Sequence, residues 1–216
     1  MTMQTITLHH LLPAVFAGRT DLQSELWEQD LVLERGRLYL VEAQSGKGKS
    51  SFCSYLMGYR QDYSGQICFD STDVRQLSVR EWSRLRTHSI STLFQELRLF
   101  PELTALENVL IKNQLTRHKT VAQIRQWFEA MGIGDRIDTL VSRMSFGQQQ
   151  RVAMIRALVQ PMDFLLLDEP VSHLDDENAA AMAETMMQEV RSQGAAVVVT
   201  SIGKHMKLPY NQTIRL

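Results

Sequence analysis

Short apolar runs recur along the chain and are separated by segments with helical spacing. The runs are 37–43 ("RLYLVEA"), 163–170 ("DFLLLDEP") and 195–202 ("AAVVVTSI"). Uninterrupted runs rich in leucine and β-branched residues are typical of strands that are buried on both faces of a sheet. Because helical segments alternate with them, the pattern predicts an α/β fold with a parallel sheet and helices on both of its faces.

Two helices are predicted beside these strands. The segment 49–59 ("KSSFCSYLMGY") directly follows a glycine-rich stretch, and the segment 176–194 ends at Gly194, a residue type that commonly stops helices. A strand, a glycine-rich turn and a helix therefore follow one another between residues 37 and 59.

The middle of the chain carries mainly helical signals. The segments 78–81 ("SVRE") and 104–107 ("TALE") each place Glu three residues after Ser or Thr, which is the capping-box pattern of a helix start. The segment 120–133 has helical spacing and breaks at Gly132. We therefore expect residues from about 97 to 145 to be helical and to interrupt an α/β core that resumes afterwards.

The composition narrows the class of protein. The chain has 216 residues, of which 44% are hydrophobic and 22% charged, and this length suffices for one sizeable core. Its formal net charge of −1 argues against a nucleic-acid partner. No stretch reaches the ~20 apolar residues of a membrane-spanning helix, and no signal peptide is evident. We therefore expect a cytoplasmic protein that reaches a membrane only through a partner.

The glycine-rich stretch 41–52 ("VEAQSGKGKSSF") predicts a phosphate-binding loop. In the pattern G-x-x-x-x-G-K-[ST], backbone N–H groups and the start of a helix surround phosphates. Lys49 would reach the outer phosphates, Ser50 would bind Mg²⁺, and Ser51 would add a phosphate contact. Ala43 replaces the first glycine, which the loop tolerates if φ is negative there. A flexible basic turn is the alternative. The predicted nucleotide contacts in this loop are Gln44, Ser45, Gly46, Lys47, Gly48, Lys49, Ser50 and Ser51.

The second apolar run ends in two adjacent carboxylates. Asp168, at the end of the predicted strand, is suited to hold Mg²⁺ through a water molecule. Glu169 can polarise a water for attack on a terminal phosphate. Two carboxylates that are merely solvated at a strand end are the alternative. Judged together with the loop, the pair favours a P-loop nucleoside triphosphatase.

The segment 143–158 ("RMSFGQQQRVAMIRAL") resembles the signature motif of ATP-binding cassette (ABC) proteins, L-S-G-G-Q-x-Q-R. Met144 replaces Leu, and Phe146 replaces the first Gly of the pair. The order of motifs also fits this family, because Gln95 in "LFQ" lies between the loop and the signature, and 172–175 ("SHLD") follows the carboxylates. The residues that match the signature are Ser145, Gly147, Gln148, Gln150 and Arg151.

The resemblance covers essentially the whole chain and implies its fold. ABC cassettes have a P-loop NTPase (RecA-like) core with a mostly parallel sheet, an N-terminal antiparallel β portion and an inserted α-helical subdomain. Residues 1–216 would form a single nucleotide-binding domain, with the core in 1–96 and 151–216 and the helical subdomain in about 97–150.

The resemblance also implies roles for residues around ATP and Mg²⁺. Glu169 and Gln95 would be catalytic, with Gln95 contacting both the metal and the attacking water. The signature helix would aim its N-terminus at the γ-phosphate held by a second, identical subunit, so that ATP joins a head-to-tail dimer. The implied metal ligands are Ser50, Gln95 and Asp168. The implied signature contacts are Ser145, Gly147 and Gln148.

The resemblance also implies how adenine is bound and which partners the protein has. An aromatic residue near the N-terminus stacks on adenine in this family; Phe16 is the candidate, with Trp27 behind it, and a core position for Phe16 is the alternative. The segment 93–111 resembles cassettes of lipoprotein-release, cell-division and macrolide-export systems. These work with integral membrane subunits of the permease type, which would hold the protein on the inner face of the cell membrane.

One further departure bears on turnover. The family usually has a histidine after the last apolar run that donates a hydrogen bond to the γ-phosphate, and Ile202 stands there. His205 could replace it only if the loop is rearranged. We expect an ATPase with slow turnover. An ATP-gated dimerising module with little or no hydrolysis, favoured by Ile202 and Phe146, is the alternative. A soluble cassette acting on ribosomes or DNA is disfavoured, since the chain has neither tandem cassettes nor long insertions.

Overall fold

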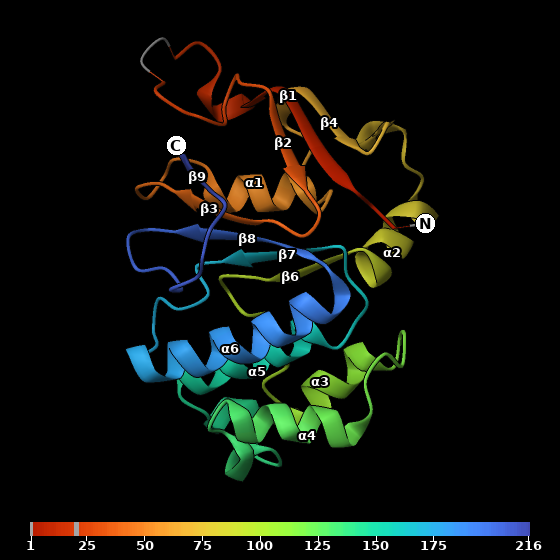
Figure 1. The fold of residues 1–216 in the computed structure, drawn as a ribbon, viewed down its shortest axis with the longest axis vertical. Helices are drawn as coiled ribbons and strands as arrows, with labels where there is room; N and C mark the ends of the chain where they lie inside the picture. The colour runs from red at the N-terminus through yellow and green to blue at the C-terminus, as the bar shows by residue number, and fades with distance from the viewer. Residues whose placement is uncertain (1, 20–21) are drawn as a thin grey trace.

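The structure is a computed structural model that describes residues 2–19 and 22–216. Its centre is a parallel sheet of five strands in the order β6-β7-β8-β3-β9 (Figure 1). The predicted apolar runs are confirmed as β3, β7 and β8, which are neighbours in the sheet. The five strands are β3 (Leu38–Glu42), β6 (Ile90–Leu93), β7 (Phe164–Asp168), β8 (Ala196–Ser201) and β9 (Gln212–Arg215).

Both faces of this parallel sheet are buried. In β3, Leu40 belongs to the hydrophobic core on one face, whereas the next residue, Val41, belongs to the core on the other. The first core includes residues of α5 (Phe146–Leu158) and α6 (Asp176–Gln193), and the second includes residues of α1 (Lys49–Leu56). Burial on both faces explains why these strands form uninterrupted apolar runs in the sequence.

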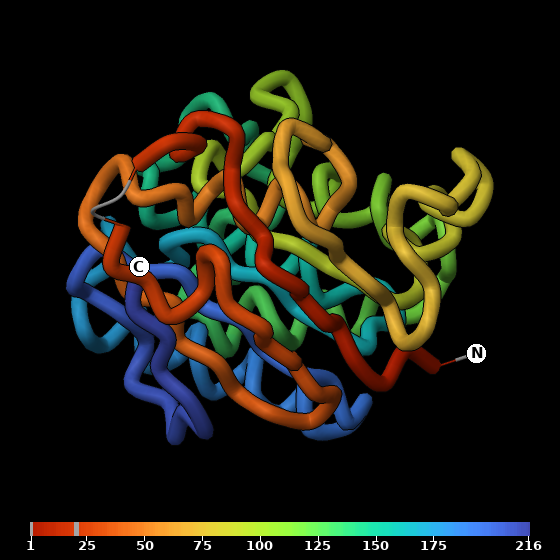
Figure 2. Tube along the Cα trace, turned by 90° about the horizontal axis from the view of Figure 1, so that it is seen from above, coloured from red at the N-terminus to blue at the C-terminus, as the bar shows by residue number. Residues whose placement is uncertain are grey.

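A second, antiparallel sheet has the strand order β2-β1-β4-β5 and packs over α1 (Figure 1). Its longest strand, β1, crosses the molecule diagonally when seen from above (Figure 2). The turn η1 (Ala14–Phe16) follows β1 and brings Phe16 against the glycine-rich loop. The expected N-terminal antiparallel portion is thus confirmed. Its strands are β1 (Thr5–Pro13), β2 (Leu31–Glu34), β4 (Tyr63–Phe69) and β5 (Thr72–Asp73).

The remaining helices carry the predicted start and stop signals. Ser78 and Thr104 each form a complete capping box, and Gly132 and Gly194 have φ of 65° and 61° where helices end. One boundary differs from the sequence interpretation: α5 continues without a break through residue 150, where the core was expected to resume. This helix contacts α3 and α4 as well as β6 and α6, so it belongs to both parts. The helices not yet given are α2 (Val79–His88), α3 (Ala105–Asn113) and α4 (Val121–Ala130).

Candidate functional site

The glycine-rich loop connects β3 to α1, as the sequence predicts. Gly46 and Gly48 have φ of 78° and 95°, a left-handed conformation that glycine adopts at little cost. Gly48 is also the residue that precedes the first turn of α1. Ala43 is not among the described residues with positive φ, and its N–H donates to the carbonyl of Ser201 in β8 at 3.2 Å. The loop therefore accommodates alanine where the usual pattern has glycine.

Lys49 begins α1 and spans the loop. Its side chain is largely buried, and Nζ donates hydrogen bonds to the carbonyl oxygens of Ala43 at 3.0 Å and Gln44 at 3.1 Å. Burial lowers the pKa of the ammonium, while the carboxylates of Glu169 and Asp168 oppose this shift. Since an ammonium has three N–H donors, one remains for an anion even in this arrangement.

A cleft of about 250 Å³ lies beside the loop. It collects side chains from the loop, from the segment after β6 and from the ends of β7 and β8. Of the contacts predicted in the loop and at the end of β7, Gln44, Lys47 and Asp168 are not part of its lining. Asp168 is the buried last residue of β7 and directly precedes Glu169 in the sequence. The lining residues are Val15, Phe16, Ser45, Gly46, Gly48, Lys49, Ser50, Ser51, Gln95, Glu169 and Ile202.

A chain of polar contacts connects the two halves of the cleft. The Oγ of Ser50 donates to Oε1 of Gln95 at 3.4 Å, and Nε2 of Gln95 donates to Oε2 of Glu169 at 3.4 Å. Behind them, Thr200 of β8 donates from Oγ1 to Oδ1 of Asp168. The structure thus brings together Ser50, Gln95 and Glu169, which are far apart in the sequence, as the family resemblance implies.

Glu169 combines an unusual backbone with a perturbed carboxyl group. Its φ is 51°, a left-handed value that non-glycine residues seldom adopt. Burial raises its pKa and the neighbouring Asp168 adds to this, whereas Lys49 and His173 act in the opposite direction. A carboxyl group with a raised pKa is a better proton acceptor when ionised, which suits a general base.

The signature motif forms the start of α5. The Oγ of Ser145 accepts the N–H of Gln148 at 3.3 Å, and Oε1 of Gln148 accepts the N–H of Ser145 at 2.9 Å. A Cβ on Gly147 would lie 3.1 Å from Cδ2 of Leu174 and 3.3 Å from the carbonyl oxygen of His173, so glycine permits close packing here. In the described part of the chain, these three signature residues do not line the cleft.

Phe146 points outward from the same helix start. Its side chain is 43% exposed, and its ring packs on the imidazole of His173 with 4.4 Å between centroids. The bulky replacement in the signature is therefore accommodated on the surface and does not displace Gly147.

Phe16 and Trp27 lie together beneath the loop. Phe16 lines the cleft but is only 3% exposed, and its ring packs on Trp27 with 6.3 Å between centroids. Its neighbour Val15 is the exposed apolar residue at this end of the cleft. The structure thus shows Phe16 in a core position, the alternative that we considered. Stacking of Phe16 on adenine stays a prediction.

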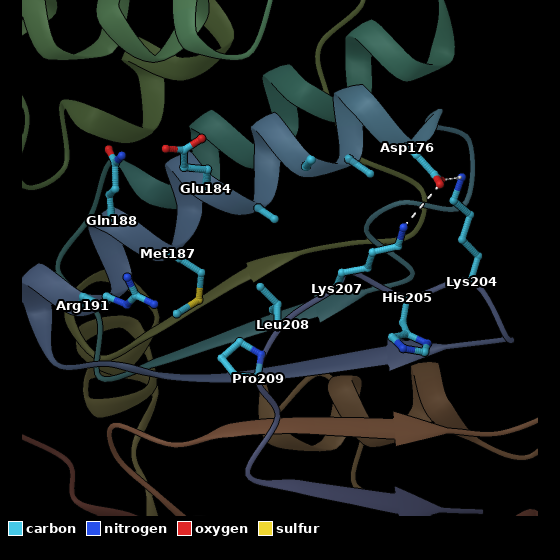
Figure 3. A pocket seen from close by; sticks show the side chains of 13 residues that line it. Asp176, Glu184, Met187, Gln188, Arg191, Lys204, His205, Lys207, Leu208 and Pro209 are labelled. Atoms are coloured by element: carbon cyan, nitrogen blue, oxygen red, sulfur yellow. Dashed lines mark ion pairs between the residues drawn. The ribbon is translucent and has the colours of Figure 1, made fainter.

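Two residues after β8 bear on the missing γ-phosphate contact, Ile202 at the expected position and His205 as the possible substitute, and they lie in different places. Ile202 is 48% exposed and lines the cleft, as the alignment of motifs predicted. His205 instead lines a separate cavity between α6 and residues 204–209 (Figure 3). Its Nδ1 lies 3.6 Å from Oε1 of Glu42, and its ring packs near Tyr210. The structure therefore does not bring His205 to the cleft.

Sequence reasoning missed the contacts that three supporting residues make. Thr200 fixes Asp168, and Gln150 donates from Nε2 to the carbonyl oxygen of Glu169 at 3.2 Å. Trp27 donates from Nε1 to the carbonyl oxygen of Lys47 at 3.1 Å. The signature motif identified Gln150, but it did not predict this contact with Glu169. For Trp27, no local pattern indicates that it reaches a loop that lies later in the sequence.

The fold and the cleft define a P-loop nucleoside triphosphatase. The family model described as ABC transporter matches residues 27–172, which is more than half of the chain. The chain therefore belongs to the ABC transporter family, and the resemblance inferred from the signature motif is confirmed. It is an ABC-type ATPase and the ATP-binding subunit of an ABC transporter.

Individual relatives agree with this assignment. The chain is 30% identical over 215 residues to YbbA of Escherichia coli K12, an uncharacterized ABC transporter ATP-binding protein, covering 98% of this chain and 93% of that protein. It is 33% identical over 190 residues to the lipoprotein-releasing system ATP-binding protein LolD of Myxococcus xanthus, covering 86% and 84%. The dimeric structure of the bacterial ABC transporter cassette MJ0796 matches with a TM-score of 0.77 and 24% identity, covering 91% of this chain and 87% of that chain. This structural match supports the fold.

Proposed function

We propose that this ATPase forms a dimer around Mg-ATP and drives a conformational change in integral membrane subunits, with slow turnover. The observation that carries the proposal is the cleft itself, in which the phosphate loop, Gln95 and Glu169 converge. Backbone N–H groups and Lys49 would bind the phosphates, and Glu169 would accept a proton from the attacking water.

The oxygen atoms near Ser50 fit a magnesium ion. The Oγ of Ser50 and Oε1 of Gln95 already lie 3.4 Å apart, and Thr200 holds Asp168 at the end of β7, directly before Glu169. Hydroxyl, amide and carboxylate oxygens are hard ligands of the kind that Mg²⁺ prefers. When bound, the ion would neutralise charge that develops on the phosphates. Ser50, Gln95 and Asp168 would hold it.

A second subunit would complete the site. Ser145, Gly147 and Gln148 cluster at the N-terminus of α5, outside the cleft of their own chain. A helix N-terminus attracts anions, so this cluster would meet the γ-phosphate in the cleft of a second copy. The matched cassette MJ0796 is described as dimeric, which supports an identical second copy here.

The membrane partner is inferred from the relatives. LolD belongs to lipoprotein-releasing systems, and we propose permease-type membrane subunits for this chain too. Among the described residues, no helix is long and apolar enough to cross a membrane. The protein would then be peripheral on the cytoplasmic face of the cell membrane. A nucleic-acid partner is not part of the proposal, given the net charge of −1.

Calorimetry with Mg-ATP tests the nucleotide site. Lys49→Ala removes the ammonium that spans the loop and should abolish most binding, whereas Lys207→Ala, on an exposed residue outside the cleft lining, should bind like wild type. Wild-type affinity in Lys49→Ala would refute the phosphate-loop assignment.

A second candidate function is an ATP-gated binding module that dimerises with little hydrolysis. It is favoured by Ile202, because an isoleucine in the cleft lining offers no hydrogen bond to a phosphate. Phosphate release by the purified protein separates the two candidates: measurable turnover that Glu169→Gln abolishes supports the ATPase, and intact binding without turnover supports the module.

A further inference from the structure

The indole of Trp27 contacts the phosphate loop from its buried side. Trp27 is 2% exposed, and its Nε1–H donates to the carbonyl oxygen of Lys47 at 3.1 Å. The ring also faces Gly48, because a Cβ added there would lie 2.9 Å from Cζ2 of Trp27. The side chain thus holds the two residues before Lys49, one by a hydrogen bond and the other by packing.

This hydrogen bond fixes the direction of one peptide of the loop. The carbonyl of Lys47 and the N–H of Gly48 belong to the same peptide unit, and the described chain contains no cis peptide bond. In a trans peptide these two groups point in opposite directions. With the carbonyl turned toward the buried indole, the N–H of Gly48 points away from it, and Gly48 lines the cleft. Backbone N–H groups presented in this way bind phosphate oxygens.

Trp27 is itself held in place. The Oγ of Ser24 accepts the N–H groups of Leu26 at 3.1 Å and of Trp27 at 2.8 Å, which closes a turn around the residue. The rings of Phe16 and Phe52 each pack on the indole with 6.3 Å between centroids. The indole therefore presents its N–H in a direction that is fixed by contacts outside the loop.

We propose that Trp27 is a positioning residue for phosphate binding, acting through the peptide between Lys47 and Gly48. The inference rests on the proposed nucleotide-binding function and adds a residue outside the cleft lining to it. Glycine-rich loops lose much conformational freedom when they are ordered around a ligand. A loop in which one peptide is held beforehand loses less, so it binds the nucleotide more tightly.

The test compares two conservative tryptophan variants. Trp27→Phe keeps an aromatic ring and removes the N–H, whereas Trp82→Phe makes the same change at a buried residue of α2 that is not in the cleft lining. For Mg-ATP, Trp27→Phe should raise both Kd and KM about tenfold while kcat stays near that of wild type, since the lost interaction acts on binding. Trp82→Phe should leave all three constants near wild type.

Fluorescence gives an independent readout. Trp27 contacts the loop, whereas Trp82 packs on Phe69 and Trp127 lies in α4. Mg-ATP should therefore change the emission of wild type and of Trp82→Phe but leave that of Trp27→Phe unchanged. The response shows that nucleotide reaches the surroundings of Trp27, and thermal unfolding of both variants separates stability from binding, because a variant that merely weakens the fold would lower the melting temperature without raising Kd.

Several outcomes would overturn the proposal. One is a Kd of Trp27→Phe equal to that of Trp82→Phe, even with reduced stability. If Trp27→Phe fails to fold by circular dichroism, Ser24→Ala replaces it, since it loosens the turn around Trp27 without altering the core. Ser24→Ala should weaken binding about twofold to threefold, and wild-type affinity there contradicts the proposal. Absence of Mg-ATP binding in wild type would instead refute the proposed function and this inference with it.

Discussion

Three residues of the site depart from the usual sequence of the family, and each lies in a different environment. Ala43 occupies ordinary backbone conformation, and Phe146 is exposed beside His173. Ile202 differs from these two because its side chain is part of the cleft lining. The first two replacements leave the cleft unchanged, so the third is the one that should limit catalysis.

Replacing Ile202 by histidine tests this conclusion. Ile202→His would place a hydrogen-bond donor in the cleft where the transition state gains negative charge, so kcat should rise on the order of tenfold with little change in KM. Ile202→Leu, which adds no donor, is the matched control and should not raise kcat. Steady-state phosphate release measures both.

The gain should also depend on the general base. In the background of Glu169→Gln, Ile202→His should give no increase, because no carboxylate remains to accept the proton. Fast wild-type turnover that Ile202→His leaves unchanged would show that isoleucine at this position is not what limits the reaction.

At the scale of elements, a buried ion pair ties the helical part of the chain to α6. Lys119, just before α4, lies with its Nζ 2.7 Å from Oε2 of Glu189 in α6, and the side chains are 11% and 6% exposed. His118 lies 3.5 Å from the other carboxylate oxygen, and Gln193 also donates to it. The orientation of α4 against α6 therefore depends on a charge that is largely removed from water.

Removing the lysine should be costly. Lys119→Met would leave the carboxylate of Glu189 buried without its main partner and should lower the free energy of unfolding by ~3 kcal/mol, the lower end for a broken buried pair because Gln193 and His118 remain. Lys119→Met combined with Glu189→Gln should recover much of this loss, since no uncompensated charge remains. Denaturant unfolding measures both variants. A double variant as unstable as Lys119→Met would contradict this account.

The elements that the sequence predicts best are those with the strongest burial pattern. The strands β3, β7 and β8 are buried on both faces and are therefore apolar at nearly every position. The strand β9 lies at an edge of the sheet, and Ile214 is its only buried residue. A strand of four residues with mixed polarity has no recognisable hydrophobic pattern in the sequence. The contacts of Trp27 and Thr200 were not predictable for another reason: they depend on which segments, far apart in the sequence, lie side by side in the fold.

At the scale of the whole molecule, one chain contains all the predicted parts of the nucleotide site but does not bring them together. The phosphate loop, Gln95 and Glu169 meet in one cleft, whereas the start of α5 with Ser145 lies outside its lining. The order of motifs predicted the class of protein, since it spans the whole chain. The number of subunits does not follow from it, because an interface between identical chains leaves no spacing pattern in the sequence.

A variant that binds ATP but cannot hydrolyse it should reveal this assembly. Glu169→Gln has nearly the same shape as the natural side chain, so it preserves the neighbouring contact of Gln95 while removing the base. Hydrolysis should fall by at least ~100-fold, the contribution typical of a general base, and ATP should stay bound. Because bound ATP would then keep joining two copies, gel filtration with Mg-ATP should show a dimer more clearly than for wild type.

Lys49→Ala added to Glu169→Gln should restore the monomer, since the dimer requires nucleotide. A monomeric Glu169→Gln with ATP bound would refute the shared site, and normal turnover would refute the catalytic role of Glu169.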